Sequence, residues 1–259
     1  MPPACQVNGV LAAADRTAHQ YGEAHATVYD RLYGQRFVPG DAVAALAAAA
    51  GPGGRILELG LGTGRLAIPL AARGVRVDGI EASASMIARL RAQPGGGQVG
   101  VFQQDLADFR IPGVRYDVAV CAVSTLFMLP NRAAQQQCLS AAAAQLVHGG
   151  QVFIEAFRPD HTRFDTHHQR VETRPDPDGG GHVVRSRHDA QQQTIHIRHE
   201  LTDGDTTNSY EVVLRYLYPA EIDVLAQHAG LSLVARWGDW SGCVATTNSM
   251  DPISVYVRR

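Results

Sequence analysis

The sequence of 259 residues predicts an α/β fold in which a doubly wound, mostly parallel sheet is covered by helices on both faces. Three observations predict it. Short apolar segments alternate with segments of helical periodicity over most of residues 51–157. A glycine-rich turn directly follows the first apolar segment. The alternation gives way to a two-residue period within residues 158–218 and a helical segment returns at Pro219.

The predicted core sheet has seven strands, and helices separate most of the first five. The strands are expected at 56–59, 75–80, 100–103, 117–121, 151–155, 231–237 and 253–257. Asp41, Ser83 and Asn131 each precede a helical segment and are expected as N-caps. Pro219 suits the first turn of the helix that ends near Gly230.

An insertion after the fifth strand is expected to form a separate small sheet. Residues 183–187, 194–201 and 210–217 alternate apolar and polar side chains, and turn signals lie at 179–181 and 203–205. We therefore expect three antiparallel strands, which act as a lid over the ligand site or as a dimer contact through an open edge. The whole chain, 1–259, is then one domain with an N-terminal helical cap (1–50), a core (51–157 and 219–259) and an insertion (158–218).

Composition narrows the classes of partner. The net charge is only −2 and no basic run exists, so nucleic acid is not an expected partner. The longest apolar run, 42–50, is too short to span a bilayer. The four cysteines are scattered without metal-ligand spacing, and the first residues lack the layout of a signal peptide. We expect a cytoplasmic protein without a bound metal; a homodimer is compatible with the insertion.

Carboxylates and glycines recur where the first three predicted strands end. Glu58 lies in the first strand, and glycines occupy 60, 62 and 64. Glu81 ends the second strand, where a carboxylate can accept both hydroxyls of a ribose, and Asp105 ends the third, where it can accept from the amine of a base. One adenosine would satisfy all of these elements.

A dinucleotide fits this pattern less well than a cationic nucleoside. The G-x-G-x-x-G pattern, begun at Gly60, puts Arg65 where a small residue should allow close helix packing. Glu58 would also oppose a pyrophosphate, whereas it suits an amino acid ammonium. An NAD-dependent enzyme is therefore the least favoured reading.

The segment from Glu58 to Gly64 resembles the first motif of class I methyltransferases that use S-adenosylmethionine (SAM), an acidic residue followed by G-x-G-x-G. The resemblance covers about residues 53–156. It implies a Rossmann-like core, SAM as cofactor and S-adenosylhomocysteine as product. The cofactor-binding residues it implies are Tyr29, Tyr33, Glu58, Gly60, Leu61, Gly62, Gly64, Glu81, Ala82, Met86, Asp105, Leu106, Ala122 and Val123.

The resemblance also implies a role for each part of this set. The glycine turn lies along the methionine part, and Glu58 orients its ammonium. Glu81 holds the ribose, Met86 packs on the adenine, and Asp105 with Leu106 recognises the adenine edge. Ala122 and Val123 line the sulfonium. Tyr29 and Tyr33 fit a lid over SAM about as well as they fit a packed helix face.

The insertion and the segment from Tyr29 to Tyr33 are similar to features of small bacterial N-methyltransferases of peptides and amino sugars. This similarity implies a small-molecule or peptide acceptor in natural-product biosynthesis. No strong base motif is present, which favours an amine acceptor, because a hydroxyl would need a base with a tuned pKa. Two alternatives stay open: a SAM-binding enzyme that catalyses a cyclisation or rearrangement, and a non-enzymatic SAM-binding module.

Catalytic residues are not defined by the sequence. Tyr33, His161, His167 and His168 are the weak candidates, the histidines because they follow the fifth strand at the rim where an acceptor would enter. His196 and His199 are three residues apart in a predicted strand, so their side chains point to opposite faces and do not form a metal pair.

Overall fold

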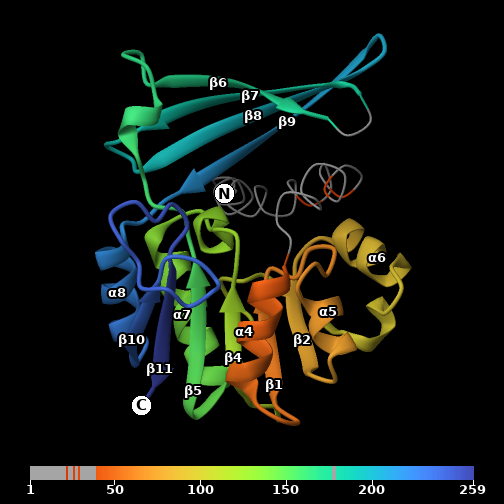
Figure 1. The fold of residues 1–259 in the computed structure, drawn as a ribbon, viewed down its shortest axis with the longest axis vertical. Helices are drawn as coiled ribbons and strands as arrows, with labels where there is room; N and C mark the ends of the chain where they lie inside the picture. Colours follow the sequence, from red (N-terminus) through yellow and green to blue (C-terminus); the bar gives the residue numbers. More distant parts are fainter. Residues whose placement is uncertain (1–21, 23–25, 27–28, 30–38, 177–178) are drawn as a thin grey trace, which may run out of the picture.

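The computed structural model describes residues 22, 26, 29, 39–176 and 179–259. They form two sheets, a seven-stranded core sheet and a four-stranded sheet that stands over it (Figure 1). Of the predicted N-terminal helical cap (1–50), the structure describes residues 22, 26, 29 and 39–50, and Tyr33 lies outside the described residues. In the described part of the chain, no helix is both long and apolar enough to cross a membrane.

The core sheet has the strand order β10-β11-β5-β4-β1-β2-β3. Its strands are β1 (Arg55–Leu59), β2 (Arg76–Glu81), β3 (Gly100–Gln103), β4 (Tyr116–Cys121), β5 (Leu146–Glu155), β10 (Leu231–Trp237) and β11 (Ile253–Arg258). The pairs among β1 to β5 are parallel, and β11 is antiparallel to both neighbours. The predicted mostly parallel sheet is confirmed. Its strand order reverses between β1 and β4, which is where ligands bind in such sheets.

Helices cover both faces of the core sheet, because its central strands are apolar on both sides. The helices are α4 (Gly40–Ala50), α5 (Ala67–Ala72), α6 (Ala84–Ala92), α7 (Arg132–Gln145) and α8 (Pro219–His228). Ile56 and Val118 share one buried cluster with residues of α4 and α5. Leu57 and Ala119, their neighbours along the strands, share the other with residues of α7 and α8.

Two of the three predicted N-caps are confirmed. The side chains of Ser83 and Asn131 each accept a hydrogen bond from the backbone N–H three residues on, at 3.2 and 2.9 Å. Asp41 is not an N-cap, because α4 begins at Gly40 after Pro39 and no side chain caps its first turn. Asp41 lies within that turn, where its negative charge faces the positive end of the helix dipole.

The insertion forms four antiparallel strands where the sequence predicts three. They are β6 (Gln169–Pro175), β7 (Gly181–Asp189), β8 (Thr194–Asp203) and β9 (Thr206–Arg215), in that order. β6 was missed because its inward positions carry ion pairs instead of apolar side chains. Glu172 pairs with Arg170 and, at 3.0 Å, with Arg174. A strand of this kind has no hydrophobic periodicity to detect.

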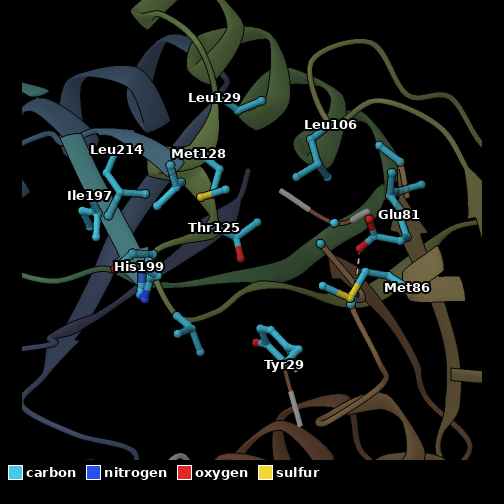
Figure 2. Close-up of a pocket in the computed structure, with 18 of the residues that line it drawn as sticks. Tyr29, Glu81, Met86, Leu106, Thr125, Met128, Leu129, Ile197, His199 and Leu214 are labelled. Atoms are coloured by element: carbon cyan, nitrogen blue, oxygen red, sulfur yellow. Dashed lines mark hydrogen bonds between the residues drawn. The ribbon is translucent and has the colours of Figure 1, made fainter. Parts of the chain in front are cut away.

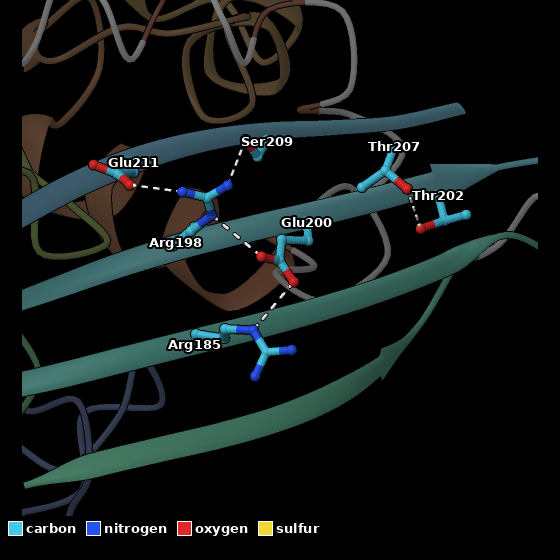
Figure 3. Close-up of polar contacts among 7 residues, drawn as sticks. All are labelled: Arg185, Arg198, Glu200, Thr202, Thr207, Ser209 and Glu211. Atoms are coloured by element: carbon cyan, nitrogen blue, oxygen red, sulfur yellow. Dashed lines mark hydrogen bonds and ion pairs between the residues drawn. The ribbon is translucent and has the colours of Figure 1, made fainter. Parts of the chain in front are cut away.

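The four-stranded sheet lies over the carboxyl ends of the core strands, and the chain enters it after β5 and returns to the core at α8 (Figure 1). Its inner face carries buried side chains such as Val184 and Val212. Its outer face carries charges. Figure 3 shows Arg198 between Glu200 and Glu211, which its guanidinium contacts at 3.2 and 3.3 Å.

Candidate functional site

A cavity of about 270 Å³ lies between the carboxyl ends of the core strands and the inner face of the four-stranded sheet. What we call the core wall consists of Gly60, Gly62, Ile80, Glu81, Ala82, Met86, Asp105, Leu106, Val123, Ser124, Thr125, Met128 and Leu129, together with Gly22 and Tyr29. What we call the sheet wall consists of Arg174, Val184, Ser186, Ile197, His199, Val212 and Leu214. Figure 2 shows Glu81 and His199 on opposite sides, with Thr125 between them.

The glycine turn after β1 forms the floor of the core wall. Gly60, Gly62 and Gly64 have φ angles of 80°, 56° and 88°, which L side chains rarely adopt. A Cβ atom on Gly60 would lie 2.5 Å from Thr125 Cγ2, so only glycine lets β1 end this close to the turn after β4. Gly64 does not line the cavity; a Cβ there would lie 2.9 Å from Leu90 Cδ1, in the core.

Glu81 joins the glycine turn to the start of α6. Its Oε2 accepts a hydrogen bond from Gly62 N at 2.8 Å, and its Oε1 accepts one from Ser83 N at 2.9 Å. Burial raises the pKa of this carboxyl above its ordinary value, and these backbone N–H groups oppose the rise. Because each carboxylate oxygen has two lone pairs, both can still accept from a pair of ligand hydroxyls.

Glu58 is a buried carboxyl behind the turn. Its side chain is 5% exposed, and its Oε2 has no hydrogen-bond partner among the described residues. Burial raises its pKa to about 8, against the influence of the Arg65 guanidinium. Glu58 does not itself line the cavity. A buried carboxyl oxygen without a partner is costly, and a ligand cation that reaches it would relieve that cost.

The turn after β4 is strained and was not recognised in the sequence as a special conformation. Val123 and Ser124 have φ angles of 50° and 58°, although neither is glycine. Glu155 fixes this turn: its Oε2 accepts from Val123 N at 2.8 Å, and its Oε1 accepts from Trp240 Nε1 at 2.9 Å. Ser124 Oγ accepts from Phe157 N at 2.9 Å. These bonds hold the adjacent Thr125 in the cavity.

The structure brings most of the predicted cofactor residues to the cavity. Those that line it are Tyr29, Gly60, Gly62, Glu81, Ala82, Met86, Asp105, Leu106 and Val123. Leu61 and Ala122 lie in the buried core instead, with 2% and 6% of their surfaces exposed. The Leu61 side chain packs over Gly79 of β2, so it supports the turn from behind.

The sheet wall was missed by sequence reasoning. It is built from alternate residues of neighbouring strands, such as Ile197 and His199 on β8 and Val212 and Leu214 on β9. The available signal was a histidine at one of the alternate positions of β8 that otherwise carry apolar side chains. This is His199, which is 4% exposed, whereas His196 is exposed. The prediction that these two side chains point to opposite faces is confirmed.

The predicted catalytic histidines do not line the cavity. His161 Nε2 lies 2.6 Å from the Tyr218 hydroxyl, and its ring lies tilted by 32° against that of His188, with centroids 4.6 Å apart. His167 and His168 are exposed. Tyr33 lies outside the described residues. No group of three or more metal-ligating side chains occurs within the part of the chain that the structure describes.

Known proteins are similar to this chain in both sequence and fold. A family model described as a methyltransferase domain matches residues 56–150. The structure of the CcbJ methyltransferase from Streptomyces caelestis is 34% identical, with 94% of this chain and 99% of that chain covered and a TM-score of 0.85. The cypemycin N-terminal methyltransferase of a Streptomyces species is 26% identical over 243 residues, 92% of this chain and 98% of that protein.

A further solved structure is similar in fold. The SAM-bound structure of CalS10, an amino pentose methyltransferase from Micromonospora echinaspora involved in calicheamicin biosynthesis, is 20% identical, with 100% of both chains covered and a TM-score of 0.65. The resemblance stated from the glycine motif and the expectations of SAM as cofactor and of a SAM-dependent methyltransferase are therefore confirmed. The chain belongs to the class I SAM-dependent methyltransferase family.

Proposed function

We propose that this enzyme methylates an amine nitrogen of a small-molecule or peptide acceptor in natural-product biosynthesis. The observation that carries the proposal is the single cavity that joins a core wall with carboxylates to a sheet wall made mainly of apolar side chains. Relatives support the acceptor class, since one is described as acting on the N-terminus of cypemycin and another on an amino pentose.

In this proposal SAM lies along the core wall. Glu81 receives the ribose hydroxyls, Asp105 with Leu106 meets the adenine edge beside Met86, and Glu58 attracts the ammonium. The chemistry of these groups fits the cofactor: Oε2 of Glu58 is buried without a partner among the described residues, and the glycine turn leaves bare backbone beside Glu81. A cation at Glu58 would convert a costly buried acid into an ion pair.

The bound cofactor supplies a methyl group that its sulfonium already activates. The protein then has to hold the acceptor nitrogen in line with the sulfur–methyl bond and exclude water. The turn fixed by Glu155 sets Thr125 on the core wall, between Glu81 and His199, and the sheet wall positions the acceptor (Figure 2). We assign the core to residues 51–157 and 219–259, the acceptor lid to 158–218 and the cap to 1–50.

An acceptor screen with matched pairs tests this proposal. The protein is incubated with SAM and either a peptide with a free N-terminal amine or its N-acetylated form, and with an amino sugar or its hydroxyl analogue. We expect S-adenosylhomocysteine and a singly or doubly methylated product only with the free amine of a pair, read by mass spectrometry. Methylation of the acetylated peptide or of the hydroxyl sugar at an equal rate would contradict it.

A further inference from the structure

Two buried imidazoles form a pair on the inner face of the four-stranded sheet. His182 on β7 and His199 on β8 are 2% and 4% exposed, and His182 Nε2 lies 3.0 Å from His199 Nδ1. The His199 ring also stacks on Tyr210 of β9, with centroids 4.6 Å apart and an interplanar angle of 17°. His199 therefore lies between a buried partner and the cavity that it lines (Figure 2).

The pair has the chemistry of a single proton acceptor. In the hydrogen bond between the two rings, one nitrogen donates and the other accepts, so at least one of the two bonded nitrogens lacks its own proton. An imidazole changes charge near neutral pH, and two adjacent imidazolium cations repel each other. The pair can therefore take up one proton, whereas a second is opposed.

Among the described residues, the charged side chains around the pair leave an imidazole, and no carboxylate, to meet a cationic acceptor on the sheet wall. Arg174, which lies opposite His182 in the register of β6 and β7, is a cation on the same wall and is paired with Glu172. Tyr210 faces His199 from β9, and the carboxylates of Glu81 and Asp105 belong to the opposite wall. No carboxylate is among the described residues of the sheet wall, so an ammonium group there meets an imidazole instead of an anion.

We propose that the His182–His199 pair takes the proton from the acceptor amine before methyl transfer. This inference rests on the proposed amine acceptor. An alkylammonium has no lone pair and cannot attack the methyl group. Its N–H bond breaks, and the proton forms an N–H bond with the imidazole pair through His199. The lone pair of the neutral nitrogen then forms a bond to the methyl carbon. The sulfur–methyl bond breaks at the same time, and the electron pair of that bond stays on sulfur.

The test is the pH profile of kcat/KM with the first amine that the screen identifies. We expect His199→Gln to lower kcat/KM about 100-fold at pH 7, within the range for loss of a general base. The rate of the variant should rise about tenfold per pH unit and converge on the wild-type rate near the pKa of the amine, because free base then forms without help. His182→Gln should give the same convergence with a smaller loss.

His188→Gln is the matched control. His188 is another buried imidazole on the inner face of β7, but it is bonded to the Tyr216 hydroxyl at 2.9 Å and does not line the cavity. Its substitution should give a profile parallel to that of the wild type. Calorimetric titration with SAM checks that His199→Gln is folded, since its SAM affinity should stay within twofold of wild type.

Two kinetic outcomes separate the inferences. A loss in His199→Gln that is equal at every pH would mean a structural role and would overturn the proton-acceptor role alone. Methylation of hydroxyl acceptors only would overturn the amine proposal itself. NMR titration of the histidine ring nitrogens in wild-type protein is independent of any variant. Uptake of one proton by the pair between pH 5 and 9 supports the role, and no uptake overturns it.

Discussion

The two walls of the cavity differ in how the sequence encodes them. The core wall consists mostly of residues at strand ends. There the glycine turn offers backbone N–H groups and Glu81 and Asp105 offer carboxylates, each within the short sequence segment that marks it. The sheet wall consists of every second residue of neighbouring strands, and it offers an apolar surface together with the His199 imidazole. We infer that the core wall determines cofactor affinity and the sheet wall acceptor use, so substitutions in the two walls should separate these properties.

Glu81→Ala should have the largest effect on the core wall. It removes a carboxylate that accepts from Gly62 N and Ser83 N and, in our proposal, from the ribose. Charge-assisted hydrogen bonds contribute about 1.5–3 kcal/mol each, so S-adenosylhomocysteine affinity should fall about 100-fold or more by equilibrium dialysis. Asp108→Ala is the control, since Asp108 is an exposed carboxylate on the same loop as Asp105 and lies outside the cavity.

Glu58→Gln should improve stability while it weakens SAM binding. The folded-state pKa of Glu58 is raised from 4.5 to about 8, so the wild type loses stability as the pH rises from 4.5 to 8. At pH 7 this effect lowers the free energy of unfolding of the wild type by about 3 kcal/mol, and the uncharged Gln side chain of the variant does not cause it. Urea unfolding should therefore show a gap in favour of the variant that widens from pH 5 to pH 8.

The same substitution also tests the ammonium assignment. SAM affinity should fall about tenfold in Glu58→Gln, as expected when one charged partner is lost. In the wild type, a cation beside Glu58 should expel its proton near pH 7. Calorimetric heats would then depend on the ionisation enthalpy of the buffer, and this dependence should vanish in the variant. A wild-type heat that is identical in all buffers at pH 7 would argue against the assignment.

Leu214→Ala should affect the acceptor without affecting the cofactor. Leu214 lies in the sheet wall, whereas its neighbour Val213 lines a groove on the outer face of the same strand. Loss of apolar contact should raise the acceptor KM about fivefold, the equivalent of about 1 kcal/mol, in initial-rate measurements at saturating SAM. Val213→Ala should leave KM unchanged; an equal rise in both variants would assign the effect to the strand instead of the wall.

Arg198→Ala should have the smallest effect. Arg198 contacts Glu200, Glu211 and Ser209 on the outer face, and its side chain is 49% exposed (Figure 3). Exposed ion pairs contribute about 0–1 kcal/mol, so the free energy of unfolding should change by less than about 1 kcal/mol. KM and SAM affinity should not change. A larger kinetic effect would show that the outer face also influences the reaction.

The core was predictable because its signals are local. Buried parallel strands are continuous apolar segments, and side chains such as Ser83 and Asn131 mark the helix starts. The glycine turn and Glu81 could be placed from the same local signals. The strained turn at Val123 could not, because its conformation depends on Glu155, 32 residues further on.

The sheet wall and β6 could not be predicted for a related reason. The inward side chains of β6 are stabilised by ion pairs of Glu172, so its alternation is not hydrophobic. His182 and His199 are 17 residues apart and meet only through the register of β7 and β8. The two-residue alternation of β8 did show that His199 and His196 point to opposite faces. It did not show which of the two faces lines a cavity.

The most direct test of the two-wall account is calorimetric titration of SAM into Glu81→Ala and Leu214→Ala side by side with the wild type. The account predicts that SAM affinity falls about 100-fold or more in Glu81→Ala, for the loss of at least two charge-assisted hydrogen bonds, and stays within twofold in Leu214→Ala. Wild-type affinity in Glu81→Ala, or an equal loss in both folded variants, would contradict the division of the cavity into a cofactor wall and an acceptor wall.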